Sequence, residues 1–555
     1  MRSYSRGHKQ YNQFSRGQKK RTGQAIQPLD QVEHKKCIQA KLAILTRNPA
    51  LSNVFLTCEN YHPFKHPLSS LRALAGQTAA YGLSTIIGRT LNYLLVPLYT
   101  RLFLPEAYGV VTDLYALVAF LNVVYSYGME TAFFRRASEK GEQAYGTAFW
   151  SLTLSSIVFT ALLIAGANPL AAALRYPEHQ EYVVWFAFIL GLDALAVIPF
   201  ARLRQQEKAL RFASLKLINI GLNVGLNLFF LLVLPHWSET RQFLSLVDAV
   251  YDPTLGVGYI FLSNLLANGI TLLLLVPTFP RFRGRFDPQL WREMFVYGLP
   301  LLPAGLAGMV NETFDRILLK YLLPGEVSEN LYQVGVYGAV YKLAMLMSLF
   351  TQAFRTAAEP FFFQQAKQLG APQLYARIMN YFVFAGSLIL VGVVLFLDIV
   401  KAFIGAAYHE GLGVVPILLV ANLMLGIYYN QSVWYKLADK TRYGMWFSLF
   451  GAALTIGLNV LLIPILGYYG AAWTTLAAYS AMVLVSYVYG QRHYPVPYAL
   501  ARLASYIGLA LVLVAIELVL LSRHTGYWVW AMRIGLCLAY VMFGWWREKP
   551  IKSVT

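Results

Sequence analysis

The chain has 555 residues, of which 57% are hydrophobic and 13% are charged, with a mean hydropathy of +0.49. This composition is typical of an integral membrane protein and excludes a soluble multidomain enzyme. Cys37, Cys58 and Cys537 are too few for a disulfide framework and have no metal-binding spacing. We therefore expect no metal, no cofactor and no redox chemistry.

Residues 1–68 contain twelve Lys or Arg residues, three acidic residues and no long apolar segment. This composition predicts a basic, disordered cytoplasmic extension, and it does not resemble an export signal. A basic tail can bind nucleic acid or anionic lipid. We expect instead a solvated tail, or a start codon assigned too far upstream, and no nucleic-acid partner.

The rest of the chain contains about fourteen apolar segments, each long enough to cross a hydrocarbon layer of ~30 Å. They lie near 74–101, 107–128, 146–167, 181–201, 212–234, 258–279, 295–322, 331–354, 379–404, 412–434, 443–466, 470–490, 500–521 and 526–546. Lys and Arg residues concentrate in alternate connections, whereas the opposite connections contain only Arg175, Arg241 and Arg523. The sequence therefore predicts an all-α polytopic membrane protein with about 14 transmembrane helices and both termini in the cytoplasm.

The sequence also repeats itself. Tyr81-Gly82-Leu83 in the first segment matches Tyr297-Gly298-Leu299 in the seventh, and Gly225-Leu226-Asn227 in the fifth matches Gly457-Leu458-Asn459 in the eleventh. Such a repeat predicts two parallel six-helix lobes related by a pseudo-twofold axis along the membrane normal. We expect the extension at 1–68, an N-terminal lobe at 69–280, a C-terminal lobe at 281–492, and two additional helices with a cytoplasmic tail at 493–555.

Several motifs, in order and in matching segments, resemble one family. They are Tyr81-Gly82-Leu83-Ser84, Leu94-Leu95-Val96-Pro97-Leu98-Tyr99-Thr100-Arg101, Leu104-Pro105-Glu106-Ala107-Tyr108-Gly109-Val110, Gln205-Gln206-Glu207-Lys208-Ala209-Leu210-Arg211-Phe212, Asp315-Arg316-Ile317-Leu318-Leu319, and Gly457-Leu458-Asn459 with Gly467-Tyr468-Tyr469-Gly470-Ala471-Ala472. The chain resembles, over about 70–546, the polysaccharide and O-antigen (lipopolysaccharide) flippases of the multidrug/oligosaccharidyl-lipid/polysaccharide exporter superfamily.

This resemblance implies a transporter without catalytic residues in the bacterial inner membrane. It would move undecaprenyl-pyrophosphate-linked oligosaccharide to the outer leaflet by alternating access, with membrane lipids, a polysaccharide polymerase and a chain-length regulator as partners. The alternatives are a drug/cation antiporter or a peptidoglycan-precursor flippase of the same superfamily, or a membrane O-antigen polymerase or ligase. An enzyme of the last kind would need a large outer loop with catalytic residues and would leave the duplication unexplained.

Passage of a pyrophosphate through hydrocarbon requires a hydrophilic cavity with fixed positive charge. Arg89, Arg316 and Lys342 are the basic candidates for this cavity, because each falls inside a predicted span. Asp315 and Asn311 lie on the same segment as Arg316, and we expect them near the substrate. For each of these residues, a structural ion pair or a contact between helices is the alternative. Arg101 and Lys320, at outer helix ends, are expected to reach the headgroups.

Two acidic residues, Asp193 and Asp113, are candidates for binding a coupling cation or proton, with structural pairing as the alternative. Glu517 and Arg533 occur in the last two segments and are expected to pair with each other. Pro97, Pro300 and Pro303 predict bends in the first helix of each lobe, since proline removes a helix hydrogen bond. Asn223, Asn227 and Asn459 could bind sugars or join helices.

Overall fold

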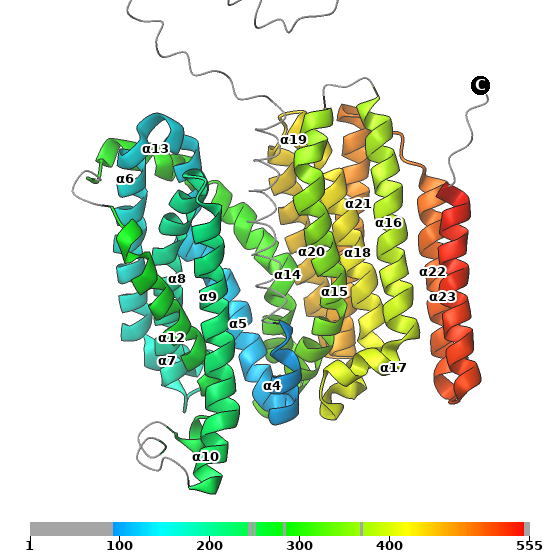
Figure 1. Ribbon diagram of the computed structural model, residues 1–555, viewed down its shortest axis with the longest axis horizontal. Helices are drawn as coiled ribbons and strands as arrows, with labels where there is room; N and C mark the ends of the chain where they lie inside the picture. Colours follow the sequence, from blue (N-terminus) through cyan, green and yellow to red (C-terminus); the bar gives the residue numbers. More distant parts are fainter. Residues whose placement is uncertain (1–92, 242–246, 248–250, 281–284, 367–369, 549–555) are drawn as a thin grey trace, which may run out of the picture. The chain divides into compact units, whose positions relative to one another are not determined.

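A computed structural model describes residues 93–241, 247, 251–280, 285–366 and 370–548. The described chain is helical and contains no β-strand, and Figure 1 shows the order of its helices. The longer helices of the first half are α5 Pro105–Ser126, α6 Met129–Ala165, α8 Gln180–Gln205, α9 Ala209–Leu228 and α12 Gly258–Leu275, with the short helices α4 Val96–Leu102, α7 Ala167–Ala173 and α10 Leu234–Thr240.

The second half begins with α13 Pro288–Gly298 and ends with the helix pair α22 Leu500–Val519 and α23 Tyr527–Glu548. Between them lie α14 Leu301–Leu322, α15 Val327–Gln365, α16 Ala371–Leu395, α17 Leu397–Val400, α18 Val415–Gln431, α19 Val433–Leu437, α20 Arg442–Leu466 and α21 Tyr468–His493. Large apolar side chains such as Leu273 and Ile465 remain more than two thirds exposed. Lipid, rather than water, is the solvent that suits such a surface.

The helices confirm an all-α polytopic membrane protein. Within the described chain, eleven helices are long and apolar enough to cross a membrane, or twelve if the bent pair α13 and α14 is one span. One of the eleven, Pro105–Ala165, is α5 together with α6 and covers two predicted spans. Most of the predicted first span, 74–101, lies outside the described residues.

The pairing of helices repeats between the two halves. In the first half, α5 contacts α6 and α8, α6 contacts α8, and α12 contacts both α8 and α9. In the second half, α15 contacts α16 and α18, α16 contacts α18, and α21 contacts both α18 and α20. Each pair occupies the same position in its predicted six-helix repeat. We call α4 to α12 the N-terminal helices and α14 to α21 the C-terminal helices.

The two sets of helices meet where α5 crosses α15, through glycine. A Cβ atom on Gly335 would lie 1.8 Å from the carbonyl oxygen of Pro105, and one on Gly109 would lie 2.0 Å from that of Leu331. No side chain fits at such distances, so the backbones can approach only because both residues are glycine.

The connection between the two halves is bent. Helices α13 and α14 meet at an angle of 40°, and Pro300 is the N-cap residue of α14. The bend predicted near Pro300 is therefore present, because proline cannot continue the hydrogen-bond ladder of the preceding turn. Beyond the bend, α13 packs against α6 of the N-terminal helices.

The last two helices run side by side (Figure 1) and pack against α16. Arg533 on α23 lies 2.6 Å from Glu517 on α22, which confirms the expected pair, and 2.8 Å from Asp398 on α17. One arginine thus joins three helices through ion pairs.

Candidate functional site: a cationic cavity

Two adjoining hollows lie between the N-terminal and C-terminal helices. The first, of about 330 Å³, is lined by α4, α5, α9 and α12 on one side and by α14 and α15 on the other. The second, of about 450 Å³, continues along α15 to α18. Both are lined by Val96, Glu312, Tyr341, Lys342 and Met345, so we treat them as one site and call it the cationic cavity. Each volume falls within the range of about 300–1,000 Å³ that is usual for ligand pockets.

The cationic cavity is named for the charged side chains among its described lining residues. Arg316 on α14 and Lys342 and Arg355 on α15 face a single acidic residue, Glu312. Two further acids lie behind the lining, since Asp315 is 3.3 Å from Arg316 and Glu359 is 3.6 Å from Arg355. The surface that faces the hollow is therefore cationic, although two of its three cations are paired. The attraction between an anion in the cavity and these basic side chains would be stronger than in water, because the surrounding dielectric constant is low.

Arg316 is held in place by its neighbours. Its Nη1 donates to the backbone oxygen of Glu312 at 2.7 Å, one helical turn earlier, and lies 3.3 Å from Oδ1 of Asp315. The guanidinium group also stacks over the ring of Tyr341 at 4.2 Å. Only 9% of the residue is exposed, which suits a preorganised group with a small face toward the cavity.

Asp315 acts on Arg316 and does not line the cavity. Its Oδ2 accepts a hydrogen bond from the hydroxyl of Tyr337 at 2.6 Å, and its Oδ1 accepts from the backbone N–H of Arg316 at 2.9 Å. Asp315 is 3% exposed and Tyr337 is fully buried. The carboxylate is thus fixed beside the arginine and balances part of its charge.

Lys342 lines both hollows. Within the described chain, its Nζ forms no ion pair and no hydrogen bond. The alternative to a cavity role for Lys342, an ion pair with Asp113 or Glu312, is therefore not formed. An ammonium group that faces a cavity beside Arg316 is available to bind an anion.

Asn311 joins helices and does not line the cavity. Its Nδ2 donates to the backbone oxygen of Ser448 at 3.0 Å, and its Oδ1 accepts from Thr455 at 3.0 Å. Tyr479 donates to its backbone oxygen at 2.9 Å. These bonds attach α14 to α20 and α21.

The two acidic candidates lie apart from the cavity. Asp193 on α8 accepts a hydrogen bond from Asn268 on α12 at 2.8 Å. Asp113 on α5 is fully buried and forms an ion pair with Lys320 on α14. The expectation that Lys320 reaches the headgroups was therefore wrong. Its partner lies 207 residues earlier in the chain, and neither side chain is exposed.

The remaining basic candidate, Arg89, lies outside the described residues. Of the predicted site residues only Arg316 and Lys342 are among the described lining residues, and the lining residues that were not predicted include Arg355, Tyr115 and Asn264. Arg355 directly follows the predicted eighth span, 331–354, whereas α15 continues to Gln365. Asn264 is an isolated amide in an apolar segment, and that pattern alone could have drawn attention to it.

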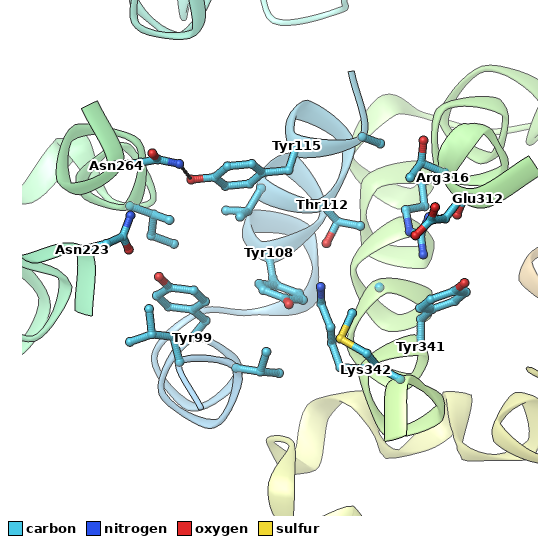
Figure 2. Close-up of a pocket in the computed structure, with 18 residues that line it drawn as sticks. Tyr99, Tyr108, Thr112, Tyr115, Asn223, Asn264, Glu312, Arg316, Tyr341 and Lys342 are labelled. Carbon is cyan, nitrogen blue, oxygen red and sulfur yellow. Dashed lines mark hydrogen bonds between the residues drawn. The ribbon is translucent and has the colours of Figure 1, made fainter. Parts of the chain in front are cut away.

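Figure 2 shows the first hollow. Tyr99, Tyr108, Tyr115, Asn223 and Asn264 come from the N-terminal helices, and across from them lie Arg316, Glu312 and Tyr341. The Nζ of Lys342 extends into the space between the two groups. The cavity is thus polar, cationic and bounded by both halves of the chain, which makes the protein a helical membrane protein with a polar cavity between two sets of helices.

Comparison with known proteins gives the same fold. The chain is similar to the lipid II flippase MurJ in an inward closed conformation, with a TM-score of 0.60, 13% identity, and coverage of 84% of this chain and 98% of the other. It is also similar to an inward-facing multidrug resistance MATE transporter of the MOP superfamily, with a TM-score of 0.53, 15% identity, and coverage of 77% and 95%. An outward-facing MATE structure gives a TM-score of 0.51 at 14% identity, with coverage of 78% and 96%.

A family model described as polysaccharide biosynthesis protein matches residues 74–366. No curated protein sequence matches the chain. Because the family match covers more than half of the chain, the protein belongs to this polysaccharide biosynthesis family, and its fold is that of membrane transporters and flippases.

Proposed function

We propose that the protein is a flippase for undecaprenyl-pyrophosphate-linked oligosaccharide in the bacterial inner membrane, serving lipopolysaccharide, O-antigen or other surface polysaccharide synthesis. The observation that carries the proposal is the cationic cavity between two sets of helices in a polysaccharide biosynthesis protein. Arg316, Lys342 and Arg355 would bind the pyrophosphate, since guanidinium and ammonium groups donate to phosphate oxygens. Arg89 is a further candidate for the same role.

Transport would proceed by alternating access of an N-terminal lobe, 69–280, and a C-terminal lobe, 281–492. In the topology that we propose, with both termini cytoplasmic, the crossing of α5 and α15 and the Asp113–Lys320 pair lie toward the outer side. These contacts would close the cavity on that side and would separate when it opens outward. The bend between α13 and α14 offers a hinge for this movement.

Of the two acidic residues proposed to couple an ion to this movement, Asp193 is the better candidate, because Asp113 already pairs with Lys320. A polysaccharide polymerase and a chain-length regulator would act on the product at the outer leaflet.

A drug/cation antiporter of the same superfamily would need a cavity that attracts cations. Lys342, which has no anionic partner in the described chain, and the neighbouring Arg316 line this cavity and argue against that alternative. A peptidoglycan-precursor flippase would carry the same pyrophosphate, so the cavity does not separate it from the proposal. If the protein were a polymerase or ligase, a strain without it would still translocate the saccharide but would not polymerise or ligate it.

A deletion strain tests the proposal. Loss of surface glycan with accumulation of cytoplasm-facing undecaprenyl-linked saccharide supports it, and the saccharide that accumulates identifies the substrate. Accumulation of peptidoglycan precursor would transfer the assignment to the related flippase. Accumulation of saccharide that has been translocated but not polymerised or ligated would show that the protein is a polymerase or ligase and would contradict the proposal.

A further inference from the structure

The described lining of the first hollow separates charged from uncharged side chains. Every charged residue there, Glu312, Arg316 and Lys342, comes from α14 or α15. The lining contributed by α4, α5, α9 and α12 contains no charge and consists of tyrosine, asparagine, threonine and aliphatic side chains. We call this second surface the neutral wall. A ligand that fills the hollow therefore meets two different chemistries.

The neutral wall presents unused hydrogen-bonding capacity. Asn264 donates through Nδ2 to the hydroxyl oxygen of Tyr115 at 2.9 Å, which leaves the Tyr115 hydroxyl hydrogen and Oδ1 of Asn264 without partners in the described chain. Asn223 accepts from Asn227 at 3.0 Å through Oδ1, and its own amide hydrogens have no described acceptor. All three side chains, those of Tyr115, Asn223 and Asn264, are partly exposed, and all three line the hollow.

Neutral donors and acceptors beside aromatic rings suit sugars. Each sugar hydroxyl group both donates and accepts, as do an amide and a phenol taken together. The C–H faces of a sugar ring pack on aromatic faces, and the rings of Tyr99 and Tyr108 lie near each other at 6.5 Å. Removing water from charged side chains costs much free energy, whereas removing it from neutral side chains costs less. A neutral wall therefore binds an uncharged sugar at a lower desolvation cost.

We infer that the neutral wall is a glycan-binding surface that holds the sugar nearest the pyrophosphate, with Tyr115, Asn223 and Asn264 as its hydrogen-bonding residues. The inference rests on the proposed function and deepens it. The cations of α14 and α15 bind the part that every such substrate shares, and the neutral wall binds the part that differs between glycans. It is therefore the specificity-determining side of the cavity.

The test compares two probes on purified full-length protein in detergent, by native mass spectrometry. One probe is the undecaprenyl-linked saccharide extracted from the deletion strain, and the other is undecaprenyl pyrophosphate. The variants are Asn264→Ala and Asn223→Ala. Asn219→Ala is the matched control, since it removes an amide from α9 one turn before Asn223 at a position that does not line the hollow. Asn219 donates to Asn268 and Thr271 on α12, so its variant is expected to melt at a lower temperature. A single cooperative melting transition establishes that each variant is folded.

Each cavity variant is expected to weaken saccharide binding about three- to tenfold, the value of one neutral hydrogen bond, and to leave undecaprenyl pyrophosphate binding unchanged. Asn219→Ala should change neither. Equal loss for both probes, or no loss for either, would overturn the glycan-binding surface. Arg316→Ala distinguishes the anion site from the glycan-binding surface, because it should weaken the binding of both probes. If it weakens neither, the proposed anion site fails whatever the asparagine variants do.

Discussion

Lys320 on α14 forms an ion pair with Asp113 on α5, and neither side chain has any exposed surface. The Nζ of Lys320 also donates to the backbone oxygen of Leu174 at 3.0 Å, and Tyr176 donates to Asp113 at 2.8 Å. Two residues that the sequence separates by 207 positions thus hold the N-terminal and C-terminal helices together.

Removing one member of this pair should destabilise the protein. Lys320→Met leaves the Asp113 carboxylate buried and uncompensated, at a cost of about 3–5 kcal/mol. The double variant Asp113→Leu with Lys320→Met removes both charges and should recover much of the loss. Thermal melting of the purified protein measures both effects. A single variant as stable as the unmodified protein would show that the pair does not form.

The glycine contact between α5 and α15 predicts a second sensitive position. In Gly335→Ala the new methyl group would collide with the backbone oxygen of Pro105, so the helices must separate, at a cost of about 1–3 kcal/mol. Gly457→Ala on α20 is the matched control, since nothing lies within 4 Å of its Cβ position. Alanine there should be neutral or slightly stabilising. Equal melting temperatures for the two variants would contradict the close crossing.

Replacing Arg533 should destabilise the protein more than replacing Lys401, which pairs with the same Asp398. Arg533→Met leaves Glu517 buried without its cation, and should lower the melting temperature clearly. Lys401→Met breaks an exposed pair with the same Asp398 and should cost no more than about 1 kcal/mol. If Lys401→Met proved the more damaging change, α22 and α23 would not be held as described.

Asp315 and Tyr337 should act on substrate binding through Arg316. Tyr337→Phe removes the hydroxyl that donates to Asp315 and should weaken undecaprenyl pyrophosphate binding about fivefold, the equivalent of one hydrogen bond of about 1 kcal/mol. Tyr375→Phe is the control, because it removes a buried hydroxyl that donates to Phe362 away from the cavity. The measurement is the ratio of the two dissociation constants at equal thermal stability. A ratio near one would show that Arg316 needs no support from this hydrogen bond.

Much of the fold could be predicted from the sequence. The apolar segments and the alternation of basic loops indicated a polytopic helical protein, because a helix that crosses the membrane needs a fixed length of apolar chain. The repeated Gly225-Leu226-Asn227 motif pointed to a duplication, and the helix pairings repeat in the same order. These features depend on local composition, which the sequence states directly.

The details of the site depend on contacts between distant residues and could not be predicted in the same way. Lys320 stands at a helix end, where a lysine normally extends to the headgroups, and only its long-range partner Asp113 keeps it inside. Asn223 and Asn227 lie one turn apart on α9. Asn223 lines the cavity, whereas Asn227 is fully buried and accepts a hydrogen bond from the hydroxyl of Tyr99. Helix rotation decides between these positions, and packing sets that rotation.

Transport by the reconstituted protein is the most direct test of the cationic cavity. The protein is placed in liposomes that contain the undecaprenyl-linked saccharide from the deletion strain, and the fraction accessible to an added glycosidase is followed over time. The unmodified protein should expose saccharide from the inner leaflet, and Arg316→Ala with Lys342→Ala should slow this exposure at least tenfold, with Tyr375→Phe unchanged. Equal rates for the double variant and the unmodified protein would contradict the account.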